Sequence, residues 1–197
     1  MLRLTKTNSA SLEALVELAR DVAPSSPSLL ALSNGLLGYP PHGFVHDLSR
    51  TDLGSGETLF RAGREAFQRW EQFDLGWVRI ANSRPAINPG ELVAVEAHTT
   101  FVWSVNFSQI TEVIDTSSRF GFLYTTTTIH VEEGQERFVL EYDADNGRVS
   151  YLIEAVSRPR HFLARIAYPF SRAMQHRFAR DSHSRMRRAV MDRAKQF

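Results

Sequence analysis

The feature that most restricts the fold is a run of six short segments in which apolar and polar residues alternate. The segments are rich in Val, Ile, Thr and aromatic residues, and with a two-residue period this composition is typical of β-strands. They cover residues 76–80, 91–101, 102–115, 119–130, 135–144 and 147–157. Turn sequences separate most of them, and Asp145-Asn146-Gly147 is the clearest. Because such short connections join neighbouring antiparallel strands, we predict an antiparallel meander.

Other patterns flank this run of strands. Residues 8–23 have an amphipathic helical pattern, residues 42–54 are predicted to form an earlier strand, and residues 54–73 a helix. After Arg158-Pro159 the remaining sequence is again helical in pattern. A curved antiparallel sheet of about six to seven strands gripping a long C-terminal helix buries one face of each element. We therefore predict an α+β fold of the START-like, or helix-grip, type with an extra N-terminal helix.

Two units are expected along the chain. Residues 1–40 are predicted to form an N-terminal helical extension, and residues 41–197 a single α+β domain. By analogy with other helix-grip proteins, this domain would hold an apolar ligand between the sheet and the C-terminal helix, although a fold predicts function only weakly.

The charges of the chain are unevenly distributed, although the formal net charge is only +1. Residues 158–197 contain 11 of the 23 Lys and Arg but only two of the 22 acids, Asp181 and Asp192. The formal charge is therefore +9 for this segment and −8 for the remainder. Nearly equal and opposite charges favour pairing within the molecule over binding of an external polyanion. We predict that the basic C-terminal helix lies on an acidic body.

The apolar stripe of the C-terminal helix changes direction along its length. Phe170 and Met174 fall on one side, whereas Met186 and the apolar residues after it point elsewhere. We predict a bend, a break or a change of packing partner near residues 179–184. The tail, residues 185–195, would then contact another surface or a second subunit. A second copy of this chain, bound through the tail as a homodimer, is therefore a possible partner.

A ligand cavity of the usual kind has an aromatic lining with a few polar groups. The residues predicted to line it are Trp103, Phe107, Tyr124, His130, Glu136, Phe138, Tyr151, Phe170, Met174 and Arg177. Arg177 either snorkels or pairs with a carboxylate of the body, or it meets an anionic group of the ligand. Which face of the sheet points inward is left open, because both faces carry apolar residues.

The most suggestive polar cluster lies in residues 125–138. A turn at Glu132–Gly134 would bring Glu136 back towards His130. Such a pair either performs acid–base chemistry or forms a hydrogen bond across the end of a hairpin, and the hydrogen bond is favoured. His130 and Glu136 are thus weak candidates for catalytic residues, and the sequence favours a binding protein over an enzyme.

Several classes of protein find no support in the sequence. The absence of Cys excludes disulfides and thiolate metal sites, and His42 and His46 are separated by about 13 Å on an extended strand, which argues against a metal. No known nucleic-acid-binding motif accompanies the basic residues, so nucleic acid is not favoured as a partner. No segment approaches the roughly 18–20 apolar residues of a membrane span, and no signal peptide is evident. We expect a cytoplasmic protein without a metal or a cofactor.

Four sequence stretches in order carry a resemblance to a known family. They are LGSGETLFRAGREAFQRWEQFDLGWVRI, INPGELVAV, RFGFLYTTTTIHVEEGQERFVL and SRPRHFLARIAYPFSRAMQHRFARDS. Together they resemble uncharacterised protein family 0548, a domain-of-unknown-function family of bacteria and plants, over residues 42–192. The chain departs from the family at Gln135, where the family has Glu in a Gly-Glu-Glu-Arg-Phe run. Of the two adjacent acids at this hairpin, only Glu136 is therefore present here. The resemblance is compatible with a helix-grip fold and brings no catalytic residue with it.

Three functions are therefore open at this point. The leading one is binding of a small apolar or amphipathic molecule between the sheet and the C-terminal helix. The second is an enzyme of the cyclase, isomerase or hydrolase type on the same scaffold, which would use His130 and Glu136. The third is an interaction protein that uses the basic C-terminal tail.

Overall fold

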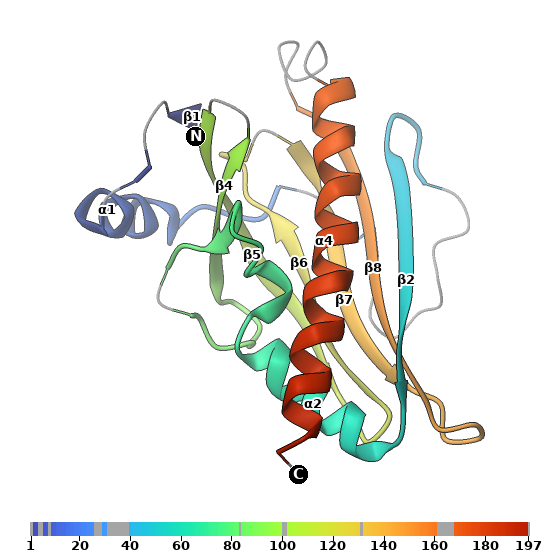
Figure 1. Cartoon of the computed structure of the whole chain (residues 1–197). Coiled ribbons are helices and arrows are strands. Elements are labelled where there is room, and N and C mark those ends of the chain that lie inside the picture. Colours follow the sequence, from blue (N-terminus) through green and yellow to red (C-terminus); the bar gives the residue numbers. More distant parts are fainter. Residues whose placement is uncertain are drawn as a thin grey trace.

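An antiparallel β-sheet curves around a long C-terminal helix (Figure 1). The computed structural model describes residues 2–3, 6–7, 9–25, 29–30, 40–82, 84–99, 102–130, 132–160 and 168–196. The strands are β1 (Leu2–Arg3), β2 (Val45–Ser55), β3 (Val78–Ile80), β4 (Leu92–Thr99), β5 (Val102–Asp115), β6 (Arg119–Thr126), β7 (Glu132–Tyr142) and β8 (Arg148–Pro159). The described helices are α1 (Ser9–Ala19), α2 (Glu57–Gln68), the short 3-10 helix η1 (Glu71–Phe73) and α4 (Tyr168–Ala194).

The order of the strands in space is that of a meander. They follow one another as β2-β8-β7-β6-β5-β4-β3, and the two-residue β1 pairs with β5. All these pairings are antiparallel. From β3 to β8 neighbours in sequence are therefore neighbours in the sheet, and β2 forms the edge beyond β8. The predicted α+β, helix-grip fold is confirmed.

The hairpin between β6 and β7 turns earlier in the chain than predicted. The turn is made by residues 127–130, whereas the predicted turn, Glu132–Gly134, lies inside β7. The Thr127 N–H and hydroxyl both donate to the Phe107 carbonyl, at 3.1 and 3.0 Å. These bonds to β5 take Thr127 out of the β6–β7 ladder. The glycine at 134 suits a close approach of strands rather than a turn, because a Cβ atom there would lie 2.2 Å from a carbonyl oxygen of β8.

The end of the concave face nearest α2 in Figure 1 is here called the lower half. Buried side chains of the main core fill it. Phe67 of α2 is buried among aromatic rings of the sheet, and its ring centroid lies 5.4–6.2 Å from those of Phe120, Phe122 and Tyr151. Phe73 of η1 packs on Phe138 at 5.3 Å. Edge-on and tilted rings at these separations are favourable contacts, so the lower half is a conventional aromatic core.

Helix α4 is continuous from Tyr168 to Ala194, so a bend or break near residues 179–184 is wrong, and the third alternative, a change of packing partner, is what the helix shows. Met186 and Val190 are fully buried in the main core, so the tail packs on its own chain. Ser182 explains the apparent rotation of the apolar stripe. It is also fully buried, and its hydroxyl lies 2.9 Å from that of Tyr151. A small polar residue therefore continues the buried stripe at a position where the sequence pattern lacks an apolar one.

The basic residues of α4 pair with acids of the body, as the charge distribution predicts. Arg172 binds Asp47 of β2, with 2.7 Å between Nη2 and Oδ1. Arg185 pairs with Glu71 and Asp74, next to η1, and Arg193 contacts Glu65 of α2. These pairs lie along both halves of the helix. The prediction of internal charge pairing is confirmed.

A bulge in β5 decides which side chains face the helix. The pairing with β6 shifts by one residue between Ile110 and Glu112. Before the bulge the even-numbered residues, Ser104, Asn106 and Ser108, line the concave side. Trp103 and Phe107 therefore point to the convex side, and their predicted place in the cavity is wrong.

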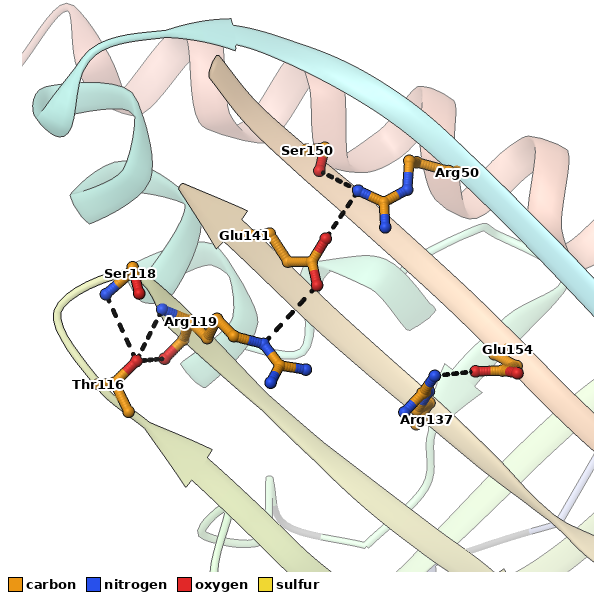
Figure 2. Close-up of polar contacts among 8 residues, drawn as sticks. All are labelled: Arg50, Thr116, Ser118, Arg119, Arg137, Glu141, Ser150 and Glu154. Carbon is orange, nitrogen blue, oxygen red and sulfur yellow. Dashed lines mark hydrogen bonds and ion pairs between the residues drawn. The ribbon is translucent and has the colours of Figure 1, made fainter. Parts of the chain in front are cut away.

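The convex side of the sheet carries the N-terminal helix and a set of charged residues. Leu12 of α1 clusters with Ala94, Val105 and Phe107, so α1 packs on the face opposite α4. Towards β2, pairs of charged side chains bridge the strands (Figure 2). Arg137 and Glu154 are both buried and form an ion pair. The carboxylate of Glu154 also lies 2.7 Å from His46 Nε2.

A second bridge on this side joins three strands. The Glu141 carboxylate contacts Arg50 at 2.7 Å and Arg119 at 3.6 Å (Figure 2). These contacts hold β2, β6 and β7 together at half-exposed positions.

Candidate functional site

A cavity of about 600 Å³ separates the upper half of the concave face from the N-terminal half of α4. Upper here means the end of the sheet where α4 begins in Figure 1. Strands β2 to β8 contribute its walls, together with η1 and α4. The N-terminal half of α4, residues 168–180, therefore closes a space that the C-terminal half, residues 181–194, fills with its own side chains.

Side-chain size explains why the concave face is open at this end. In the lower half the inward positions carry large residues such as Phe122, Phe138 and Tyr151. In the upper half the same strands present Thr126, Gly134 and Ala155 to the cavity. β5 adds Ser104, Asn106 and Ser108. A helix that rests on the large side chains of the lower half cannot also contact small ones, so a space remains.

One part of the cavity wall is apolar. It is formed by Phe73, Trp77, Val95, Ile153 and Phe178. Leu48 and Phe170 also line the cavity and are about half exposed, at 45% and 48%. Apolar side chains that are both exposed and part of a cavity wall indicate where the cavity opens to solvent.

The polar part of the wall is centred on Glu136. The register of β6 and β7 places it opposite Tyr124, whose hydroxyl donates to Glu136 Oε2 at 2.6 Å. Burial raises the pKa of Glu136 to about 7, and the neighbouring charges of Glu132 and Asp47 act in the same direction. Burial, together with the Glu136 charge, also raises the pKa of Tyr124 well above its usual value. Glu136 can therefore gain or lose a proton near neutral pH.

Two further acids connect the sheet to the start of α4. The Glu132 carboxylate accepts hydrogen bonds from Ser171 Oγ at 2.5 Å and Gln175 Nε2 at 2.9 Å. Asp47 is held by Arg172, as described above. These contacts fix the first turns of α4 against β2 and β7, and they leave Glu132 with neutral donors.

His130 lines the same cavity but is not placed opposite Glu136. Its Nδ1 lies 3.0 Å from the Glu132 backbone nitrogen, inside the turn between β6 and β7. Burial lowers the pKa of His130 to about 4, so the imidazole is neutral at pH 7. The predicted hydrogen bond between His130 and Glu136 assumed a turn four to five residues further along, and the observed register pairs Glu136 with Tyr124 instead.

Two polar atoms of the wall have no hydrogen-bond partner within the described part of the chain. They are Asn106 Oδ1 and His183 Nε2. His183 is 92% buried, since only 8% of its surface is exposed, and burial lowers its pKa to about 4. Its other ring nitrogen lies 3.5 Å from Ser49 Oγ. Buried polar atoms are normally satisfied, so both atoms are free to bind a molecule in the cavity.

Half of the sequence-predicted lining residues lie on the cavity wall. These are Tyr124, His130, Glu136, Phe170 and Met174. Phe138 and Tyr151 are on the predicted face but are fully buried in the aromatic core of the lower half. Trp103 is on the convex side, stacked on His98 at 4.4 Å.

Arg177 also lies away from the described cavity wall. Its guanidinium stacks over the Trp77 ring at 4.4 Å and lies 3.4 Å from Asp181. Asp181 belongs to α4 itself, so among the described residues the predicted pairing of Arg177 with a carboxylate of the body is not observed. A role for Arg177 in fixing a ligand has no contact to support it.

The residues that sequence reasoning missed are mostly small or polar. Asn106, Ser108, Glu132 and His183 are among them. A signal was present, because the polar residues at 104, 106 and 108 alternate with the apolar Trp103, Val105 and Phe107. Nothing in the sequence shows that these positions face inward.

The described residues include no group of three or more His, Cys, Asp or Glu side chains suited to a metal ion. No described helix has the length and hydrophobicity needed to cross a membrane.

The fold and the cavity together define a START-like, helix-grip protein. A family model described as Domain of unknown function (DUF1990) matches residues 32–185. The chain belongs to this family, and the resemblance to protein family 0548 is confirmed by relatives from three organisms.

These relatives are described as UPF0548 proteins. One from Dictyostelium discoideum is 33% identical over 158 residues, which cover 75% of this chain and 73% of the relative. One from Arabidopsis thaliana is 30% identical over 146 residues, covering 71% and 70%. One from Deinococcus radiodurans is 28% identical over 191 residues, covering 91% and 94%.

Solved structures with a similar arrangement have little sequence in common with this chain. Ara h 8.0201 is 13% identical with a TM-score of 0.45, and the match covers 73% of this chain and 98% of the other. Zhui aromatase/cyclase from Streptomyces sp. R1128 is 11% identical with a TM-score of 0.47, covering 78% and 94%. At such low identity the likeness concerns the fold alone.

Proposed function

We propose that this protein binds a small apolar or amphipathic molecule in the cavity between the sheet and α4. The observation that carries the proposal is the cavity itself, about 600 Å³ in volume. Pockets for small ligands typically measure roughly 300–1,000 Å³ and combine an apolar lining with a few polar groups. The apolar wall around Phe73 and Trp77, together with the polar group around Glu136, has this composition.

The openness of the cavity is built into the fold. Large aromatic side chains in the lower half fix the distance of α4 from the sheet, and small residues in the upper half leave the space unfilled. An empty apolar space loses contacts that a filled one would have. A ligand restores these contacts.

Native mass spectrometry of freshly purified protein tests the proposal, followed by solvent extraction and identification of bound molecules. We expect the wild type to carry a lipid or another small amphipathic molecule. The variant Ser108→Phe places a ring in the cavity and should lose it, whereas Ser108→Thr adds one methyl group and should retain it. Equal loading of the wild type and Ser108→Phe would show that the molecule binds elsewhere.

An enzyme on the same scaffold remains a second candidate because of one observation. The pKa of Glu136, raised to about 7 by burial, suits a general acid or base at neutral pH. Tyr124 and Glu136 would act together, and the neutral His130 would act separately from them. Conversion of an extracted ligand by the wild type but not by Glu136→Gln would support catalysis, and return of the ligand unchanged by both would count against it.

The remaining expectations stay predictions. They are a cytoplasmic location, the division of the chain at residue 40, and a homodimer through residues 185–195. The tail of α4 packs on α2 of its own chain, so a dimer would use the exposed side of this helix. Size-exclusion chromatography with light scattering measures the oligomeric state directly.

A further inference from the structure

We propose that the ligand is an amphipathic amine, with an apolar body in the cavity and a protonated amino group against the Glu136 carboxylate. This inference rests on the proposed function and names the chemical class of the ligand. It follows from the kinds of polar group that the cavity wall offers.

The charged groups on the wall are mainly negative. Asp47, Glu132 and Glu136 all line the cavity. Among the described wall residues Arg180 carries the one fixed positive charge, and its side chain is 72% exposed and 3.7 Å from Asp181. His130 and His183 are neutral at pH 7, because burial lowers the pKa of each to about 4. An anionic ligand would meet repulsion at this end of the cavity.

Among the described residues two of these acids, Glu132 and Glu136, have no cationic partner, and Glu136 has the fewer side-chain donors. Asp47 has the guanidinium of Arg172, and Glu132 has two neutral donors from α4. Glu136 has the neutral hydroxyl of Tyr124, and within the described residues no Lys, Arg or His nitrogen lies at ion-pair distance from it. A buried carboxylate without a cation is costly, and a ligand ammonium would provide one.

The unpartnered atoms of the wall point to the same chemistry. Asn106 Oδ1 can only accept a hydrogen bond. His183 Nε2 is an acceptor when Nδ1 carries the proton and donates to Ser49 Oγ. An ammonium has three donors and no acceptor. Additional hydroxyl or amino groups on the body of the ligand would satisfy the two unpartnered atoms.

Binding of an amine is coupled to the proton on Glu136. A nearby positive charge favours the ionised carboxylate and lowers its pKa. At a pH below about 7 the ammonium therefore displaces a proton from Glu136. Among the described residues, the titratable and charged groups around Glu136 are Asp47 on β2, Tyr124 on β6, His130 in the turn, Glu132 on β7, Tyr151 on β8, Arg160 after β8, whose charge acts on His130, and Arg172, His176, Arg180 and His183 on α4.

A series of ligands with the same chain and different head groups tests the inference. Octylamine, octan-1-ol and octanoate are titrated into the intact wild-type protein by isothermal calorimetry at pH 7.5. We expect octylamine to bind about tenfold or more tightly than the other two, because a charge-assisted hydrogen bond is stronger than a neutral one. At pH 6 octylamine binding should release up to about one proton, measured from the dependence of the enthalpy on the buffer.

Two variants locate the effect. Glu136→Gln keeps the shape of the side chain and should reduce octylamine affinity to about that of octan-1-ol, with octan-1-ol affinity within about threefold of wild type and no proton release. Glu133→Gln removes a neighbouring carboxylate that pairs with Arg158 and should retain the preference. Circular dichroism shows whether both variants are folded. If either variant is unfolded, the comparison of the three ligands on the wild-type protein tests the inference without it.

The outcomes separate this inference from the proposed function. Tightest binding by octylamine, lost in Glu136→Gln, supports both. Similar affinities for all three molecules, or tightest binding by octanoate, would overturn the amine while leaving the cavity as a binding site. Binding of none of the three to the wild type would overturn both.

Discussion

The two halves of α4 belong to one straight helix but meet the sheet in different ways. The C-terminal half buries Met186 and Val190 completely and packs on α2 and η1. The N-terminal half places Met174 and Phe178 on the wall of a cavity, and Phe170 is about half exposed. The same helix therefore serves as a structural element at one end and as the wall of a binding site at the other.

The difference lies in the sheet rather than in the helix. Opposite the C-terminal half, inward positions carry aromatic and large aliphatic residues, whereas opposite the N-terminal half they carry Ser, Thr, Gly and Ala. A packed region that fixes the helix can hold an unpacked region open, because a helix is stiff over this length. Polar contacts from Arg172, Ser171 and Gln175 then hold the start of α4 without filling the space beneath it.

The largest effect is expected where a core side chain is truncated in the packed half. Met186→Ala should destabilise the protein by about 3 kcal/mol, because it leaves a cavity in a close-packed core. Met174→Ala is the matched substitution in the other half and should cost less than about 1 kcal/mol, since the space around it is already open. Urea unfolding followed by circular dichroism measures both. Equal losses would mean that the two halves are packed alike.

The pH dependence of stability is the next largest effect. The pKa of Glu136 is about 7 in the folded protein and 4.5 for an ordinary Glu, so the folded state holds the proton more tightly. Its stabilising contribution is complete below about pH 4.5 and is lost as the pH rises through 7. The lost stability is up to about 3 kcal/mol.

Comparison with Glu136→Gln isolates this contribution from those of other groups. The stability of the variant relative to wild type should rise between pH 4.5 and pH 8. Glu91→Gln, in the exposed turn before β4, should show no such trend. Parallel pH profiles for wild type and Glu136→Gln would mean that Glu136 is not buried as described.

A smaller effect is expected at the boundary between the two halves. Ser182→Ala removes the hydroxyl that lies 2.9 Å from the buried Tyr151 hydroxyl and should cost about 1 kcal/mol. Ser184→Ala, two residues further and exposed, should be close to neutral. The same urea measurement distinguishes them, and no difference between the two would place Ser182 outside the buried stripe.

The smallest effect concerns Arg177, at the outer edge of the N-terminal half. Its contacts with Trp77 and Asp181 are half exposed, and exposed pairs of this kind contribute on the order of 0.5 kcal/mol. Arg177→Ala should leave octylamine affinity within about twofold of wild type, since the residue lies away from the described cavity wall. A tenfold change would restore Arg177 to the set of ligand-fixing residues.

Much of the fold follows from local sequence patterns. The two-residue alternation predicts each strand of the meander, and the charge distribution predicts that α4 pairs with acidic residues of the body. The cavity wall was predicted less well, because it depends on features that act over longer distances. The bulge in β5 reverses the face of Trp103 and Phe107, and the early turn at residues 127–130 separates His130 from Glu136.

Burial of polar residues is the second feature that the sequence pattern does not predict. Ser182 and His183 interrupt the apolar pattern of α4, and a hydrophobic period alone predicts a break there. Their neighbours in space, Tyr151 and Ser49, come from distant strands. Small residues at 104, 106 and 108 likewise mark a cavity only when the concave face is known.

A crystal structure of the protein with octylamine tests the open upper half most directly. We predict electron density for the ligand between the sheet and α4, with its nitrogen about 3 Å from a Glu136 carboxylate oxygen. A cavity filled by the protein's own side chains, or a ligand bound outside it, would contradict the division of α4 into a packed half and a binding half.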